Sequence, residues 1–253
     1  MATREEAKLQ RRQAIMDAAR SLMQESGTAG FSMRNLAELA NVSIATPYNL
    51  FGSKQAIMIA ILEIELQTYR KEVESIRVDD LEALFKAVTL ATGLYATEPG
   101  FYRALLFSVY NDGGTDFRSM FSGTSHALWR SLVERAIAAG HLSDKVEPNA
   151  FAINLGHIFF SCILEWVYGQ LTMEELEIRV QYGFALSLLA MAKPASAPRL
   201  RERVLTMQKR LWKIWTRNGA GDAESAKRVR GKKPTRPATA SQRRRQAHEP
   251  VTS

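Results

Sequence analysis

The sequence contains little cysteine and no long apolar run, and both absences exclude classes of protein. Cys162 is the single cysteine, so no internal disulfide can form, and neither Cys pairs nor close His pairs supply a zinc spacing. The neighbours of Cys162 are apolar, which predicts a small core residue rather than a reactive thiol. The charged N-terminus lacks the apolar centre of a secretory signal, and no continuous apolar run reaches the ~18 residues of a membrane span. We therefore expect a cytoplasmic protein with no metal site and no membrane segment.

The familiar patterns of catalysis are missing as well. The sequence shows no glycine-rich phosphate loop, no nucleophile with a paired base and no pair of carboxylates spaced for acid–base chemistry. We therefore predict no catalytic residues, no cofactor and no enzymatic activity.

The positive charge is unevenly distributed along the chain. The formal net charge is +8, but residues 219–253 hold nine Lys or Arg against three Asp or Glu, which is +6 and leaves +2 for the rest. This tail is rich in Gly, Ala, Ser, Thr and Pro and poor in apolar residues, so we predict that it is disordered. Because the basic isoelectric point mainly describes the tail, an argument for nucleic-acid binding must rest on sequence pattern.

Apolar residues recur at helical spacing through most of the chain, and strand-like alternation is absent. An all-α fold is predicted, with Gly27, Asn41, Gly52, Gly140 and several prolines as breaks between helices. The expected helices are 11–26, one that begins after Ser32, 44–51, 53–75, 79–97, 99–110, 115–140, 148–170, 172–193 and an amphipathic one after a linker at 194–198.

Two short helices near the N-terminus have the pattern of a helix-turn-helix. Ser32 can cap the first, Asn41 tolerates the left-handed backbone of the turn, and Ser43 can cap the second. Ser53 can cap the helix that follows. Ala37 and Ala40 are small enough for the helices to approach closely. The predicted core of this head consists of Phe31, Leu36, Ala37, Ala40, Val42 and Phe51.

The run from Phe31 to Ile57 resembles the DNA-binding domain of the tetracycline-repressor (TetR) family. The residues that carry the resemblance are Ser32, Leu36, Ala37, Ala40, Val42, Ser43, Thr46, Tyr48, Phe51 and Lys54. Two positions depart from the family pattern, since Ala45 stands where a glycine is common and Pro47 where Leu or Ile is common. The motif covers about residues 10–60, and the remaining helices fit the family's ligand-binding and dimerisation domain in length and character.

A third helix in the major groove would present its N-terminal positions to base edges, so Thr46 and Asn49 are candidates for base contacts, and Ser43 lies beside them. Asn49 is alternatively a solvated surface residue. Tyr48 either contacts a phosphate through its hydroxyl or serves only in packing.

Phosphate contacts are expected on either side of this helix. Ser32 and the first amides of the preceding helix can bind a phosphate, and Arg34 and Lys54 add positive charge. Lys54 is alternatively a solvated cap residue. The basic side chains among residues 4–12 either form an arm for the minor groove or belong to a solvated helical end.

Residues 79–193 are rich in aromatic side chains, and the resemblance implies a cavity among them for an apolar or aromatic effector. The candidates for its lining are Phe107, Tyr110, Phe121, Trp129, His157, Ser161 and Trp166. A polar stripe on the helix 148–170 (Asn154, His157, Ser161 and Glu165) either binds a ligand, meets a partner subunit or faces water.

The predicted domains are an arm (1–10), a helix-turn-helix head (11–55), an effector-binding and dimerisation domain (56–193), a linker with an extra helix (194–218) and the basic tail (219–253). Helices 148–170 and 172–193 are the candidates for a homodimer interface. A two-fold dimer sets its two reading helices about 34–36 Å apart, which implies a palindromic double-stranded operator. The sequence thus favours an effector-released repressor, and the alternative is a helical binding module whose head no longer binds DNA.

Overall fold

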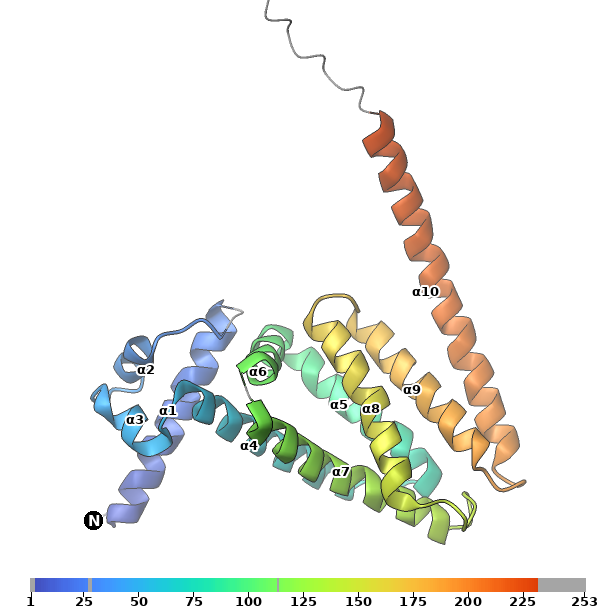
Figure 1. Ribbon diagram of the computed structural model, residues 1–253, viewed down its shortest axis with the longest axis horizontal. Coiled ribbons are helices and arrows are strands. Elements are labelled where there is room, and N and C mark those ends of the chain that lie inside the picture. Colours follow the sequence, from blue (N-terminus) through green and yellow to red (C-terminus); the bar gives the residue numbers. More distant parts are fainter. Residues whose placement is uncertain (1–2, 27–28, 113, 232–253) are drawn as a thin grey trace, which may run out of the picture. The chain divides into compact units, whose positions relative to one another are not determined.

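The computed structural model describes residues 3–26, 29–112 and 114–231, and only the backbone at 112, 114–125 and 218–231. Helices fill most of these ranges, and no strand forms within them, so the predicted all-α class is confirmed (Figure 1). The chain divides into two compact units, residues 1–211 and 212–253. The helices are α1 (Arg4–Ser26), α2 (Met33–Leu39), α3 (Ala45–Phe51), α4 (Lys54–Glu74), α5 (Asp80–Thr97), α6 (Pro99–Asp112), α7 (Gly114–Ala138), α8 (Pro148–Val167), α9 (Met173–Ala190) and α10 (Ala197–Gly231).

Helices α1, α2 and α3 pack on one another to form the N-terminal head, and α1 and α3 also pack on α4. Local capping sets their ends as predicted, because the hydroxyls of Ser32 and Ser53 accept hydrogen bonds from backbone amides at the starts of α2 and α4. The turn between α2 and α3 has Asn41 at φ 51°, and α3 ends at Gly52 with φ 82°. Both left-handed positions are occupied by residues that tolerate them.

Two details of the head differ from the sequence expectation. Helix α1 begins at Arg4, seven residues before the predicted start, because the charged residues of the expected arm are good helix formers that need no buried face to extend the helix. Ser43 does not cap α3, which begins at Ala45 without a side-chain cap; its hydroxyl pairs with the hydroxyl of Thr46 instead. The predicted cap at Gly27 lies outside the described residues.

Helices α5 to α9 form the bundle, in which α8 packs between α7 and α9. By length and composition α8 is the one helix in the described part of the chain that could span a membrane, which the sequence analysis did not anticipate. In the structure Leu155, Ile163 and Trp166 of α8 are buried in the protein core. Glu165, toward its end, is ion-paired with Arg179 of α9 at 2.8 Å. These contacts are those of a core helix.

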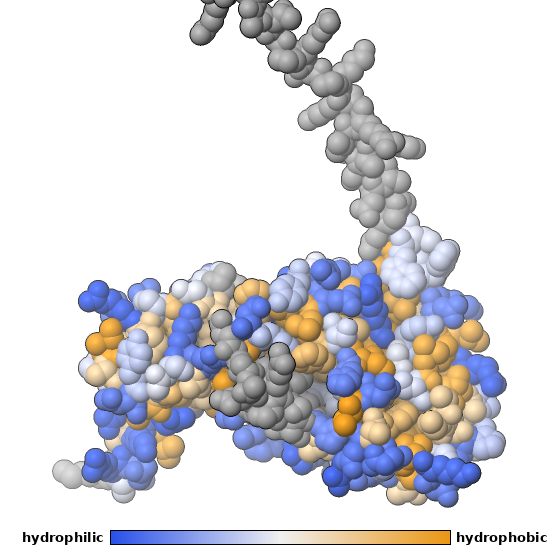
Figure 2. All heavy atoms as spheres, in the orientation of Figure 1, coloured by the Kyte–Doolittle hydropathy of each residue, from blue (hydrophilic) through white to orange (hydrophobic). Residues whose placement is uncertain are grey.

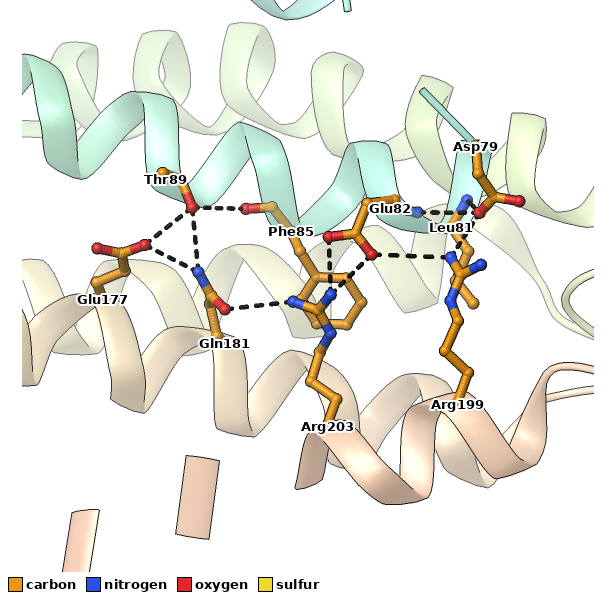
Figure 3. A network of polar contacts seen from close by, with 9 residues as sticks. All are labelled: Asp79, Leu81, Glu82, Phe85, Thr89, Glu177, Gln181, Arg199 and Arg203. Atoms are coloured by element: carbon orange, nitrogen blue, oxygen red, sulfur yellow. Dashed lines mark hydrogen bonds and ion pairs between the residues drawn. The ribbon is translucent and has the colours of Figure 1, made fainter. Parts of the chain in front are cut away.

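The first four turns of α10 have a defined partner, which the sequence did not reveal. Arg203 donates to both carboxylate oxygens of Glu82 on α5 at 2.7 Å, and its guanidinium lies 4.0 Å from the ring centre of Phe85 (Figure 3). Arg199 is ion-paired with Asp79 at 2.6 Å, and Arg203 also reaches Gln181 of α9 at 3.4 Å. This part of α10 therefore belongs to the bundle.

Helix α10 continues to Gly231, so residues 219–231, which composition predicted to be disordered, are helical here. No proline interrupts the chain between Pro198 and Pro234, and Ala, Glu, Lys and Arg in this stretch all favour helix. Residues 232–253 of the predicted tail lie outside the described residues.

Candidate functional site

The outer face of α3 is exposed and carries polar side chains that the rest of the head does not use. Asn49 is exposed and Tyr48 is 49% exposed, and in the described part of the chain neither side chain makes a hydrogen bond. Pro47, between Thr46 and Tyr48, is the buried residue of this helix. The helix therefore turns its proline to the core and its amide and phenol outward.

The start of α3 adds an apolar residue that sequence reasoning missed. Ile44 is 52% exposed directly before the helix, beside the Ser43–Thr46 hydroxyl pair, whose oxygens are 2.8 Å apart. Since apolar side chains read the methyl group of thymine in the major groove, Ile44 belongs with Thr46 and Asn49 among the candidate base contacts. The sequence alone could have indicated this exposure, because Ile44 is an apolar residue that does not fall on the helical period of the core residues.

The three predicted phosphate contacts differ in their availability. Arg34 is exposed and makes no ion pair with another described residue. The Ser32 hydroxyl is exposed but already donates to the Asn35 side chain at 2.8 Å. Lys54 is half-buried; its ammonium donates to the backbone oxygen of Phe31 at 3.0 Å and lies 4.6 Å from that ring's centre. Lys54 thus ties α4 to the segment before α2, which differs from the freely exposed charge that was predicted.

An arginine of α1 fixes the other end of α3. Arg12 donates to the backbone oxygen of Leu50 at 2.6 Å, and its guanidinium lies 4.1 Å from the ring centre of Phe51. A cation at a helix C-terminus satisfies a free carbonyl and interacts favourably with the helix dipole. Arg12 is therefore a positioning residue for α3, a role that charge alternation along residues 4–12 could not reveal.

A small cavity of about 30 Å³ lies inside the bundle. Its described lining comes from five helices, α4 to α8, and consists of Leu62, Glu65, Leu66, Tyr69, Arg70, Ala91, Leu94, Tyr95, Tyr102, Leu128, Trp129 and Phe159. Drug-sized ligands need cavities of ~300–1,000 Å³. An organic effector that bound in this cavity would therefore have to displace side chains, so the cavity is closed to such a ligand in this structure.

Of the seven residues predicted to line an effector pocket, Trp129 lines this cavity. Trp166 is buried nearby, with its ring stacked on that of Tyr95 at 5.8 Å between centres. Phe107 is exposed and Tyr110 is half-buried on α6, and the side chain of Phe121 lies outside the described residues.

His157 and Ser161 are exposed on α8, so the structure places them away from the cavity they were predicted to line. The polar stripe to which they belong faces outward because the apolar side of α8 is already used in the core. Two of its members bind α9 instead: Asn154 donates to Ser187 at 3.1 Å and Glu165 pairs with Arg179.

One carboxylate connects the cavity to the head. Glu65 of α4 lines the cavity, accepts a hydrogen bond from the Tyr102 hydroxyl at 2.6 Å and pairs with Arg20 of α1. Arg20 also bridges to Glu98 at 2.5 Å and lies 4.1 Å from the ring centre of Phe101. A single guanidinium thus joins α1, α4 and the α5–α6 junction.

Electrostatics keep the cavity hydroxyls neutral and Arg20 charged. Burial, together with the negative charge of Glu65, raises the pKa values of Tyr95 and Tyr102 well above the usual range. Burial alone would lower the pKa of Arg20, but its hydrogen bonds to Glu65 and Glu98 outweigh burial and raise that pKa. The trio of Arg20, Glu65 and Glu98 carries one positive and two negative charges.

Helix α4 runs continuously from the head into the cavity wall. Ile57 and Ile61 near its start are buried where α1 and α3 pack on it, and Glu65 and Tyr69 farther along line the cavity. Since α4 is one uninterrupted helix, it directly connects the cavity wall to the head.

Apolar side chains also reach the surface of α8 and α9. Ile153 and Leu186 are large and exposed there, with Tyr168 directly after α8 and Met191 directly after α9 (Figure 2 shows apolar patches over the bundle). Several exposed apolar residues on two adjacent helices are typical of a protein–protein interface.

Comparison with known proteins agrees with this architecture. The family model described as bacterial regulatory proteins, tetR family, matches residues 15–61, which hold most of the head. No curated protein matches the chain in sequence.

Three solved structures are similar in fold. SmeT, the repressor of the Stenotrophomonas maltophilia multidrug efflux pump SmeDEF, is 18% identical with a TM-score of 0.58, over 73% of this chain and 92% of its own. Thermus thermophilus FadR, a transcriptional repressor solved with lauroyl-CoA, is 19% identical with a TM-score of 0.62, over 72% of this chain and 95% of its own. RolR, solved with resorcinol, is 15% identical with a TM-score of 0.60, over 79% of this chain and 96% of its own. The likeness extends through the bundle and establishes the fold.

Proposed function

We propose that this chain, whose residues 15–61 match the model of the tetR family of bacterial regulatory proteins, is a cytoplasmic repressor that binds a palindromic operator as a homodimer and is released by a small organic effector. The observation that carries the proposal is the exposed outer face of α3, on which the side chains of Asn49 and Tyr48 make no hydrogen bond with any residue that the structure describes. A face without internal partners is available for an external one.

In this proposal Ile44, Thr46 and Asn49 read base edges in the major groove, and an asparagine can bond adenine through two atoms. Tyr48 and Arg34, exposed on neighbouring helices, contact phosphates. Arg12 and Lys54 hold the head rigid without touching DNA, since both are engaged inside it.

Dimerisation through α8 and α9 follows from their exposed apolar residues. A two-fold axis through that face pairs two heads, and each reads one half of the operator. FadR and RolR, which are similar in fold, were solved in complex with lauroyl-CoA and resorcinol, and this supports the binding of an organic effector by this chain. Release requires that the effector bind the non-DNA-binding conformation better than the closed one, because otherwise no equilibrium shifts.

The alternative function is a binding module whose head no longer binds DNA. In such a module no contact would be needed to keep a polar face on α3 exposed. Asn49 and Thr46 remain on that face, and Arg12 and Lys54 still brace it from both sides. This bracing favours a working head.

A gel shift with the DNA that flanks the protein's own gene tests the proposal. The wild type should bind this DNA in preference to random duplex, and Asn49→Ala should weaken specific binding about 10- to 100-fold, the value of one good base contact. Gln208→Ala, which removes an exposed amide on α10, is the matched control and should bind as the wild type does. Wild-type protein that distinguishes no flanking DNA from random duplex would contradict the proposal.

A further inference from the structure

We propose that the effector is an apolar organic cation, and that Glu65 is the carboxylate that receives its positive charge in the bundle cavity. This inference rests on the proposed function, since it names the effector class of that regulator. Its starting observation is that Glu65 is the one acidic residue in the described lining of the cavity.

Aromatic rings line the same cavity as this carboxylate. Tyr95 and Tyr102 lie 5.2 Å apart between ring centres, and Tyr69, Trp129 and Phe159 complete the aromatic part of the lining. Ring faces attract cations, most strongly when water is excluded. The remaining charged lining residue, Arg70, is directed to Glu74 at 2.7 Å, one turn along α4.

Charge balance decides between a cation and other ligands. The Glu65 side chain is 15% exposed, and both of its oxygens are engaged, one by Arg20 and one by Tyr102. A neutral ligand that displaced Arg20 would leave a largely buried carboxylate without a counter-charge, which is costly. An anionic ligand would meet direct repulsion. A cation at Glu65 leaves two balanced pairs, because Arg20 keeps Glu98.

The same exchange reaches the head. Arg20 lies on α1, the helix whose Arg12 holds the C-terminal end of α3. A cation that competes with Arg20 for Glu65 removes the direct ion pair between α1 and α4, while Glu98 continues to hold Arg20. The entering charge thus weakens the contact that fixes the head against the cavity wall.

The test is a calorimetric titration of the full-length protein with three probes of one ring system: 1-naphthylmethylamine, protonated at pH 7, 1-naphthylmethanol and 1-naphthoate. Charge-assisted hydrogen bonds are stronger than neutral ones, so the ammonium should bind about tenfold more tightly than the alcohol, and the carboxylate most weakly. Glu65→Gln should reduce the ammonium-to-alcohol ratio to about one. Glu63→Gln, which neutralises an exposed carboxylate on the same helix that does not line the cavity, should preserve that ratio.

Arg20→Met provides a second arm if Glu65→Gln does not fold, because removal of the competing guanidinium should tighten ammonium binding. An ammonium that binds no better than the alcohol, or not at all, overturns the inference, and so does a preference that survives in Glu65→Gln. A gel shift of the wild type without probes reports on DNA binding separately. A wild type that binds the operator but shows no preference for the cation therefore refutes this inference alone. A wild type that does not bind the operator refutes the proposed function.

Discussion

Replacing Arg203 by alanine should destabilise the whole bundle, because this residue joins α10 to α5 and α9. Its guanidinium contacts both oxygens of Glu82, the amide oxygen of Gln181 and the ring of Phe85 (Figure 3). The Arg203 side chain is 23% exposed, so its aliphatic part is also packed.

The magnitude follows from these contacts. A partly exposed carboxylate pair with both oxygens engaged contributes about 1 kcal/mol, above the usual surface value. The cation–π contact adds about 0.5–1 kcal/mol, and the buried methylene groups add a similar amount. The expected loss in free energy of unfolding is about 2–3 kcal/mol, which in a unit of this size lowers Tm by roughly 5–10 °C.

Thermal unfolding followed by circular dichroism measures this change. Arg210→Ala is the matched control, because Arg210 lies on the same helix but pairs with Glu174 at 3.4 Å between two exposed side chains. The control should shift Tm by no more than about 2 °C. Both variants replace arginine by alanine on one helix, so helix propensity cancels. Equal Tm shifts in the two variants would refute the assignment of α10 to the bundle.

Three further outcomes are expected. Gly183→Ala should lower the free energy of unfolding by about 1–3 kcal/mol, since a Cβ there would lie 2.7 Å from a methyl group of Ile158. Gly93→Ala on the open side of α5 should raise the free energy of unfolding by about 0.5–1 kcal/mol. Chemical denaturation measures both changes. Burial raises the pKa of the Cys162 thiol to about 11, so iodoacetamide at pH 7.5 should label native protein far more slowly than protein in guanidinium, and equal rates would contradict the burial. Burial alone would raise the pKa of Asp79, but the ion pair with Arg199 outweighs burial and lowers that pKa. The ionised carboxylate therefore stabilises the fold above the unfolded pKa of about 3.8, and this stabilisation is lost as the pH falls through the native pKa. On acidification the Tm of the wild type should therefore fall toward that of Asp79→Asn.

The features that the sequence predicted well depend on local chemistry. Ser32 and Ser53 cap helices because a hydroxyl reaches an amide three residues on, and Asn41 takes a left-handed backbone because its side chain tolerates it. Each relation lies within one turn of helix, so spacing alone reveals it. Ser43 is the exception, because its hydroxyl forms a hydrogen bond with the hydroxyl of Thr46 instead of capping α3.

The candidate pocket depends on distant contacts, and its prediction was correspondingly poor. Aromatic content indicated a cavity, but the choice among aromatic residues requires knowing which side of each helix faces inward. His157 and Ser161 were assigned to the lining because they interrupt an apolar helix, yet they face outward. Glu65 and Tyr102 are 37 residues apart and were not anticipated, because no periodicity relates α4 to α6.

Helix α1 has a larger role than a scaffold for the reading helix. Arg12 and Arg20 are two turns apart, about 12 Å along the helix axis, and each engages a different part of the protein. Arg12 binds the end of α3, and Arg20 binds a carboxylate of the cavity wall and another at the α5–α6 junction. Because a helix compresses little along its length, a change at Glu65 can reach Leu50 through α1 as well as through α4. Two connections therefore run from the cavity wall to the reading helix, one through Arg20 and Arg12 on α1 and one along α4.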